Sequence, residues 1–184
     1  MNIRYLAFLA IIFVAGVVLA APKLKKVQIS KEISVKLPQD FSPQSDDDVA
    51  RKFPATTRPL AVYSSPNDQI DFSVTQKSTP FKSQDLKMLQ EFYKANLVET
   101  FTKVDFIREE VTQVNGKDFI VFEFVSNLAD ERGASILGPV QKYSMVQYTI
   151  QGNQLLIFTM HTPFTMKNEW QPTVREVMNS INIK

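Results

Sequence analysis

The most informative pattern of apolar and polar positions lies in residues 119–125, a stretch rich in phenylalanine and β-branched residues. It follows Asn115-Gly116, a dipeptide that favours the positive φ angles of a tight hairpin turn. Read with a period of two, both of its faces are largely apolar, and its one charged residue is Glu123. Neither face can rest against water, so the pattern predicts a central strand of a sheet that is covered on both sides.

The same reading, bounded by turn residues, predicts further strands along the chain. A strand over 27–37 is ended by Pro38 and is open to interruption near Ser30. Turn-forming residues at 65–68 and 151–153 predict two more hairpins. The predicted strands are 27–37, 61–64, 70–76, 107–114, 117–126, 142–150 and 154–161.

Apolar residues recur every three or four positions over 84–101, which predicts the longest helix of the chain. Ser83 is its predicted N-cap. The predicted buried stripe comprises Leu86, Leu89, Tyr93, Leu97 and Phe101, and Phe92 and Val98 widen it. Stripes of this kind are far more often part of a core than of a cofactor site, so we expect this helix to cover the sheet.

Two further helices are predicted, over 45–53 and 167–180. In the first, Ser45 is the expected N-cap, and Asp46, Asp47 and Asp48 lie at the positive end of the helix dipole. The alternative is that these aspartates bind calcium, but consecutive carboxylates do not match the alternating ligand spacing of a calcium loop. Capping is therefore the preferred interpretation.

Short turns join several of the predicted strand pairs, which indicates a largely antiparallel sheet. Strands that are apolar on both faces need helices on both faces. The predicted fold class is therefore α+β, a three-layer α/β/α sandwich around a largely antiparallel central sheet. At 184 residues, the chain is expected to form one globular domain over 21–184 after an N-terminal segment.

Residues 1–20 have the features of a signal peptide. Arg4 supplies a positive start, an uncharged apolar run extends from Tyr5 to Val18, and Ala20 precedes the expected cleavage point. The alternative is a retained membrane anchor, because the uncharged run from Tyr5 to Pro22 has 18 residues, at the lower limit for spanning a bilayer. We expect export to a periplasmic or extracellular space, or to a lumen in a photosynthetic cell, without stable membrane insertion after cleavage.

The chain has 21 Lys and Arg against 19 Asp and Glu, a formal charge of +2. This near balance argues against a nucleic-acid-binding protein, which normally has a strong basic excess. The absence of cysteine excludes disulfides, thiolate nucleophiles and cysteine-based zinc sites. No Gly-rich phosphate loop and no metal-spaced cluster of acidic or histidine residues occurs, so no cofactor is predicted.

Candidate chemistry is sparse, and we expect a protein that is not an enzyme. His161 is the only histidine, and no Gly-x-Ser-x-Gly motif accompanies it. Two alternatives remain. Met160, His161 and Met166 are soft ligands that could hold Cu(I). A small hydrolase could use Glu123, whose carboxylate either faces a solvated groove or pairs with a cation such as Arg108 or Lys142.

The expected partner is a protein, and the oligomeric state stays open. A long polar loop, 128–140, contains the apolar pair Ile136 and Leu137 with no predicted helix or strand to bury them. Exposed apolar residues of that kind often mark an interaction site. The alternative is that they fold back over the edge of the sheet.

Several motifs of the chain resemble the PsbP-like family, which takes its name from the lumenal extrinsic subunit of photosystem II. The resemblance covers roughly 29–183. The motifs that carry it are 33–38, 59–63, 70–74, the hairpin over 115–124 and the closing helix over 170–181. It implies the three-layer fold and a role in binding or assembly rather than chemistry, as in a Ran-binding import factor and bacterial exported domains that share this fold.

Overall fold

The computed structural model describes residues 22–52, 58–128 and 140–184. In this part of the chain a seven-stranded sheet runs in the order β3-β4-β5-β9-β8-β7-β6, and each neighbouring pair is antiparallel. Its strands are β3 (Ser42–Pro43), β4 (Ala61–Ser64), β5 (Asp71–Ser78), β6 (Lys103–Val114), β7 (Lys117–Leu128), β8 (Val140–Gln151) and β9 (Gln154–Pro163). The helices are α1 (Asp46–Lys52), α2 (Leu86–Thr100) and α3 (Lys167–Asn179), with short 3₁₀ turns at Ser83–Asp85 and Phe164–Met166.

The β6–β7 hairpin forms as the sequence predicts. Asn115 and Gly116 have φ angles of 49° and 81°, the left-handed conformations that a tight turn of this type needs. Strand β7 lies between β6 and β8, and its apolar side chains on both faces are buried. The prediction of a central strand over 119–125 is therefore confirmed.

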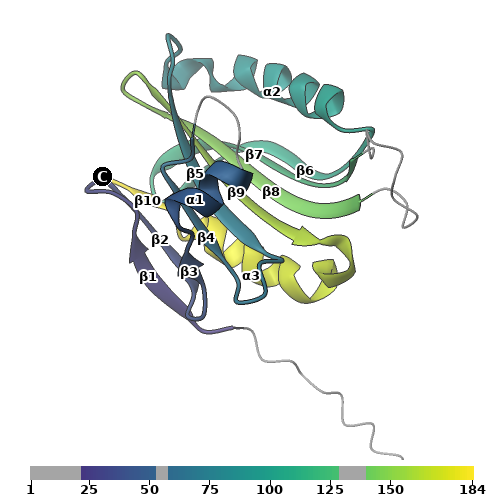
Figure 1. Cartoon of the computed structure of the whole chain (residues 1–184). Helices are drawn as coiled ribbons and strands as arrows, with labels where there is room; N and C mark the ends of the chain where they lie inside the picture. Colours follow the sequence, from purple (N-terminus) through teal and green to yellow (C-terminus); the bar gives the residue numbers. More distant parts are fainter. Residues whose placement is uncertain (1–21, 53–57, 129–139) are drawn as a thin grey trace, which may run out of the picture.

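The strand predicted over 27–37 is interrupted near Ser30, as the sequence allowed, and the chain reverses there instead of continuing as one strand. The Ser30 hydroxyl accepts hydrogen bonds from the backbone N–H groups of Glu32 and Ile33, which closes a turn. Two strands result, β1 (Leu24–Gln28) and β2 (Ile33–Pro38), and they pair with β10 (Asn182–Ile183) in a separate three-stranded sheet. This small sheet lies beside the large one, next to the C-terminus (Figure 1).

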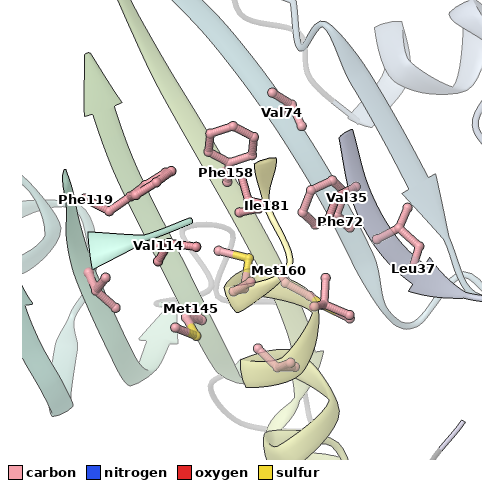
Figure 2. Packing of buried hydrophobic residues seen from close by; sticks show 14 of the residues in the cluster. Val35, Leu37, Phe72, Val74, Val114, Phe119, Met145, Phe158, Met160 and Ile181 are labelled. Carbon is pink, nitrogen blue, oxygen red and sulfur yellow. The ribbon is translucent and has the colours of Figure 1, made fainter. Parts of the chain in front are cut away.

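Helices α2 and α3 lie on opposite faces of the large sheet (Figure 1). The α3 side holds the larger cluster, to which β2 contributes Val35 and Leu37 and the sheet contributes Phe72, Phe158 and Met160 (Figure 2). The α2 side holds a smaller cluster that includes side chains of β7 and β8. This arrangement confirms the predicted α+β fold with helices on both faces of an antiparallel sheet.

Helix boundaries differ slightly from the predictions. Ser45 caps α1 as expected, since its hydroxyl accepts a 3.2 Å hydrogen bond from the N–H of Asp48. Ser83 does not cap α2; its hydroxyl donates instead to the carbonyl of Ile150, and the carboxylate of Asp85 caps the preceding turn at Lys82. None of the helices in the described ranges is long and apolar enough to cross a membrane.

Candidate functional site

Glu123 lies at the centre of a buried polar cluster between β7 and α3. Its side chain is fully buried and accepts four hydrogen bonds. The Tyr143 hydroxyl donates at 2.9 Å, the Gln171 amide at 2.5 Å, and Arg175 donates through Nε at 3.0 Å and Nη2 at 2.9 Å. Gln171 and Arg175 are four residues apart on α3, so one face of the helix supplies both.

These contacts set the protonation state of the cluster. Burial alone would raise the pKa of Glu123, but the hydrogen bonds from Arg175, Gln171 and Tyr143 outweigh it and hold the pKa below its usual value. Burial, together with the neighbouring Glu123 carboxylate, raises the pKa of Tyr143. The carboxylate is therefore ionised and both of its oxygens are engaged, which suits a tie between helix and sheet rather than catalysis.

Of the two alternatives for Glu123, a solvated groove or a cation, the structure has the cation, but it is neither Arg108 nor Lys142. Arg108 is the cross-strand neighbour of Glu123 on β6, yet its guanidinium binds Glu110 instead. A register shift between Phe106 and Arg108 interrupts the ladder there. The cation is Arg175, which lies far along the chain and reaches Glu123 from the helix above the sheet.

His161 lies on the α2 face of the sheet, where its Nδ1 is 2.7 Å from the hydroxyl of Ser144. On its other side is Asp71, the cross-strand neighbour of His161 on β5. Ser144 is almost fully buried. Burial, with a smaller contribution from Lys142, lowers the pKa of His161 to about 4. This serine, histidine and aspartate thus form a row across three strands in which the imidazole is a weak base and the hydroxyl is not accessible to a substrate.

The three soft ligands singled out from the sequence do not converge. Met160 is fully buried in the α3-side cluster, against which Met166 packs. His161 follows Met160 on the same strand and therefore points to the opposite face. Within the described residues, no group of three or more histidine, cysteine, aspartate or glutamate side chains could hold a metal ion. Ile136 and Leu137 lie outside the described residues.

The outer face of α2 carries four exposed apolar residues, Met88, Phe92, Ala95 and Val98, which we term the outer stripe; the exposed Glu91 and Glu99 lie on the same face. Met88 and Phe92 are each 57% exposed and Val98 is 56% exposed. The expectation that Phe92 and Val98 widen the buried stripe is therefore wrong. The spacing of four, three and three residues aligns these side chains on one face, opposite the buried residues of the same helix.

Helix α2 lies beside β6, the open edge strand of the large sheet. Lys94 of α2 forms an ion pair of 2.7 Å with Glu109 of β6, which fixes the helix beside this strand. Ile107 and Val111 of β6 are 41% and 39% exposed. Charged residues and the register shift protect this edge from pairing with other sheets. Among the described residues, five of the nine large apolar side chains that are exposed lie on α2 and β6.

Comparisons with known proteins identify the fold. No protein-family model matches the sequence, and no curated protein matches it significantly. Among solved structures, cyanobacterial PsbP from Synechocystis sp. PCC 6803 superposes with a TM-score of 0.60 at 11% identity, covering 90% of this chain and 95% of that one. The Ran-binding protein Mog1p of Saccharomyces cerevisiae gives 0.56 at 15% identity, with coverage of 89% and 96%.

A third similar structure is LpqN of Mycobacterium tuberculosis, a protein involved in cell envelope biogenesis. It superposes with a TM-score of 0.53 at 8% identity and covers 88% of this chain and 91% of LpqN. All three superpositions extend over nearly the whole chain. The chain therefore adopts the PsbP-like fold.

Proposed function

We propose that this chain is an exported, non-catalytic binding module whose partner is another protein, and that the outer stripe of α2 is the contact surface. The observation that carries this proposal is the exposure of Met88, Phe92 and Val98 on a well-formed helix. Each leaves more than half of its apolar surface in water, and three such residues aligned on one helix face are costly to leave uncovered.

The chemistry of the stripe favours a protein over a membrane surface. Helices that lie on membranes carry an excess of Lys and Arg on their polar side. Here Glu91 and Glu99 lie on the same face of α2 as the stripe, and Lys87 lies at its margin, so the surface is of mixed charge. A mixed polar rim around an apolar centre is the usual composition of a protein–protein interface. The spacing of the stripe suits packing against an amphipathic segment of the partner.

The stripe alone is too small for a stable interface with any partner. Helix α2 has 15 residues and is about 22 Å long, so its outer face covers about 220 Å² at a width of roughly 10 Å. A stable interface buries about 800 Å² on each partner. Two copies that meet through α2 alone would fall well short. A partner that also covers Ile107 and Val111 on β6 gains further apolar contact.

The non-catalytic part of the proposal rests on the two ionisable groups that the sequence offered for chemistry. Glu123 has its carboxylate occupied by Tyr143, Gln171 and Arg175. His161 is bonded to a buried serine and has a lowered pKa. Another protein of this fold, Mog1p, is Ran-binding, which is a role of the same kind.

The apolar pair Ile136 and Leu137 stays a prediction as a second contact. Its test is the double change Ile136→Ser with Leu137→Ser, which we expect to weaken association and to change stability by less than roughly 1 kcal/mol. A large fall in melting temperature would assign these residues to the core instead.

The proposal is tested by photo-crosslinking in the native cell. A crosslinking amino acid at position 92 should capture one distinct protein, whereas the same amino acid at Lys77, an exposed position on β5, should not. Adding Met88→Ser and Val98→Ser to the protein that carries the crosslinker at position 92 should reduce the yield several-fold. Crosslinks to lipid only, to another copy only, or equally from positions 92 and 77 would contradict the proposal.

Export is tested separately by the intact mass of the protein recovered outside the cytoplasm. We expect a chain that begins at Ala21, because the sequence of residues 1–20 has a positive start, an apolar run and a small residue before the cleavage point. Recovery of the chain with Met1 still attached in a membrane fraction would overturn this part of the proposal.

A further inference from the structure

A polar pocket of about 550 Å³ opens where the three-stranded sheet meets the end of α3. Its wall on the sheet side carries Lys26, Ser34, Lys36 and Asn182, and its wall on the helix side includes Glu176. The elements that line the pocket include β1, β2, β10 and α3, which lie on the side of the molecule away from α2 (Figure 1). Its volume is within the range of small-molecule sites.

The two lysines form an unusual pair. Lys26 on β1 and Lys36 on β2 are direct cross-strand neighbours, so their side chains project from the same face of the small sheet. Like charges directly opposite each other destabilise a sheet. Neither ammonium group has an ion-pair partner among the described residues, and Glu176 has none either. A bound anion between the lysines would relieve their repulsion.

Other polar groups of the pocket are also free to bind a ligand. Ser34 is only 7% exposed, and its hydroxyl has no hydrogen-bond partner in the described part of the chain. The side-chain amides of Asn179 and Asn182 likewise have none there. A nearly buried hydroxyl and two amides can satisfy the hydroxyl groups and remaining oxygens of a polar ligand.

Hydrogen bonds between neighbouring elements hold the walls of the pocket in place. The amide of Asn115 donates to the carbonyl of Ile181 at 2.7 Å, which ties the β6–β7 turn to the chain after α3. The Ser180 hydroxyl accepts a 2.8 Å hydrogen bond from the backbone N–H of Lys36, which ties the same segment to β2. The polar side chains of the pocket that have no hydrogen-bond partner among the described residues therefore project from elements that are hydrogen-bonded to one another.

We propose that this pocket binds a small hydroxylated oxyanion, that is, a sugar phosphate or a sugar acid. The two ammonium groups bind the oxyanion, and the amides, the Ser34 hydroxyl and the Glu176 carboxylate receive the hydroxyl groups. One carboxylate among two lysines leaves a net positive charge, which favours an anion over a neutral sugar. This inference is independent of the partner proposed for α2.

The test is a titration of the purified protein at low salt with glucose 6-phosphate, glucuronate and neutral glucose, followed by amide chemical shifts. We expect saturable shifts around the pocket for one or both acids, with a Kd of the order of 1 mM, and none for glucose. The tighter of the two acids identifies the phosphate or the carboxylate as the natural anion. Lys26→Gln and Lys36→Gln should each raise the Kd roughly tenfold.

The matched control is Lys31→Gln, which removes the same charge from an exposed position in the β1–β2 turn. It should change the Kd by less than about twofold, as expected for a distant, solvent-screened charge. An equal effect of Lys31→Gln would show nonspecific attraction and overturn the proposal. So would equal binding of glucose, no saturation by about 20 mM of either acid, or a loss of stability without a loss of affinity in the two pocket variants.

Discussion

The two long helices of this domain are attached to the same sheet in different ways. Helix α3 buries Val174, Val177 and Met178 in the larger cluster and is tied to β7 through Arg175 and the fully buried Glu123. Helix α2 buries Leu86, Leu89 and Leu97, but its outer face carries exposed apolar residues as well. Its ion pair to the sheet, between Lys94 and Glu109, lies near the surface.

This difference indicates that the stability of the domain and its contact with a partner depend on opposite faces of the sheet. A buried, fully hydrogen-bonded pair costs much when one partner is removed, whereas an exposed pair contributes little. The α3 side thus determines how firmly the domain is folded. The outer face of α2 adds nothing to the core, so its apolar residues are available to contact a partner protein.

The largest effect should follow from breaking the tie of α3. Arg175→Ala leaves the buried carboxylate of Glu123 without its cation, and we expect a loss of about 2–3 kcal/mol after allowing for the partial exposure of the arginine. The measurement is chemical denaturation at pH 7. Lys94→Ala, which removes the corresponding ion pair of α2, is the control and should cost less than about 1 kcal/mol. Equal losses would refute the contrast between the two helices.

The two faces should also differ in their response to acid. The lowered pKa of His161, about 4 against 6.5 in the unfolded chain, means that the unfolded state binds more protons between these values. Stability should therefore fall as the pH drops below 6.5, by roughly 1–2 kcal/mol between pH 7 and pH 5. Glu123, whose pKa is also lowered, contributes stability that is lost only below about pH 4.5.

Denaturation of the wild type and of His161→Gln across this pH range separates the two contributions. The variant should show a flatter profile between pH 7 and pH 5, because glutamine does not titrate. Parallel profiles for the two proteins would show that the acid response does not come from the α2 face.

A smaller, stabilising effect is expected from replacing Gln147, which is fully buried on the α3 face. Neither end of its amide has a hydrogen-bond partner among the described residues. Gln147→Met removes these unsatisfied groups at similar volume and should raise stability by about 1 kcal/mol. Gln141→Met, at an exposed position of the same strand, should leave the melting temperature nearly unchanged. A loss of stability in Gln147→Met would show that the amide is satisfied in solution.

The smallest effect on stability should come from the outer stripe. Phe92→Ser and Met88→Ser each remove an exposed side chain and should change the free energy of unfolding by less than about 0.5 kcal/mol. Leu89→Ala on the buried face of the same helix should cost roughly 2–4 kcal/mol. Similar losses on both faces of α2 would mean that the outer stripe belongs to the core.

The sequence predicts the layers of this fold well, because strand and helix periods depend on local neighbours. It singles out Glu123 as anomalous in a central strand, but it does not identify Arg175. That partner depends on the position of α3 over the sheet, which many distant contacts determine together. Cross-strand register suggests Arg108, but this side chain binds Glu110 on its own strand instead.

The outer stripe and the pocket could not be predicted from the sequence, for different reasons. Phe92 and Val98 fit the helical period, but periodicity does not distinguish a wide buried stripe from two stripes on opposite faces. Exposure requires the position of the sheet. Lys26 pairs with Lys36 only because the chain turns at Ser30. A single strand over 27–37 does not place these two lysines opposite each other.

The affinity of this chain for the protein captured at position 92 tests the central claim most directly. It should be measured by calorimetry for the wild type, for the double variant Met88→Ser with Phe92→Ser, and for Lys77→Ser as the control. We expect the double variant to bind at least roughly tenfold more weakly while its melting temperature stays the same, because exposed anchor residues act in binding alone. Equal affinities, or a loss of affinity that parallels a loss of stability, would contradict the account.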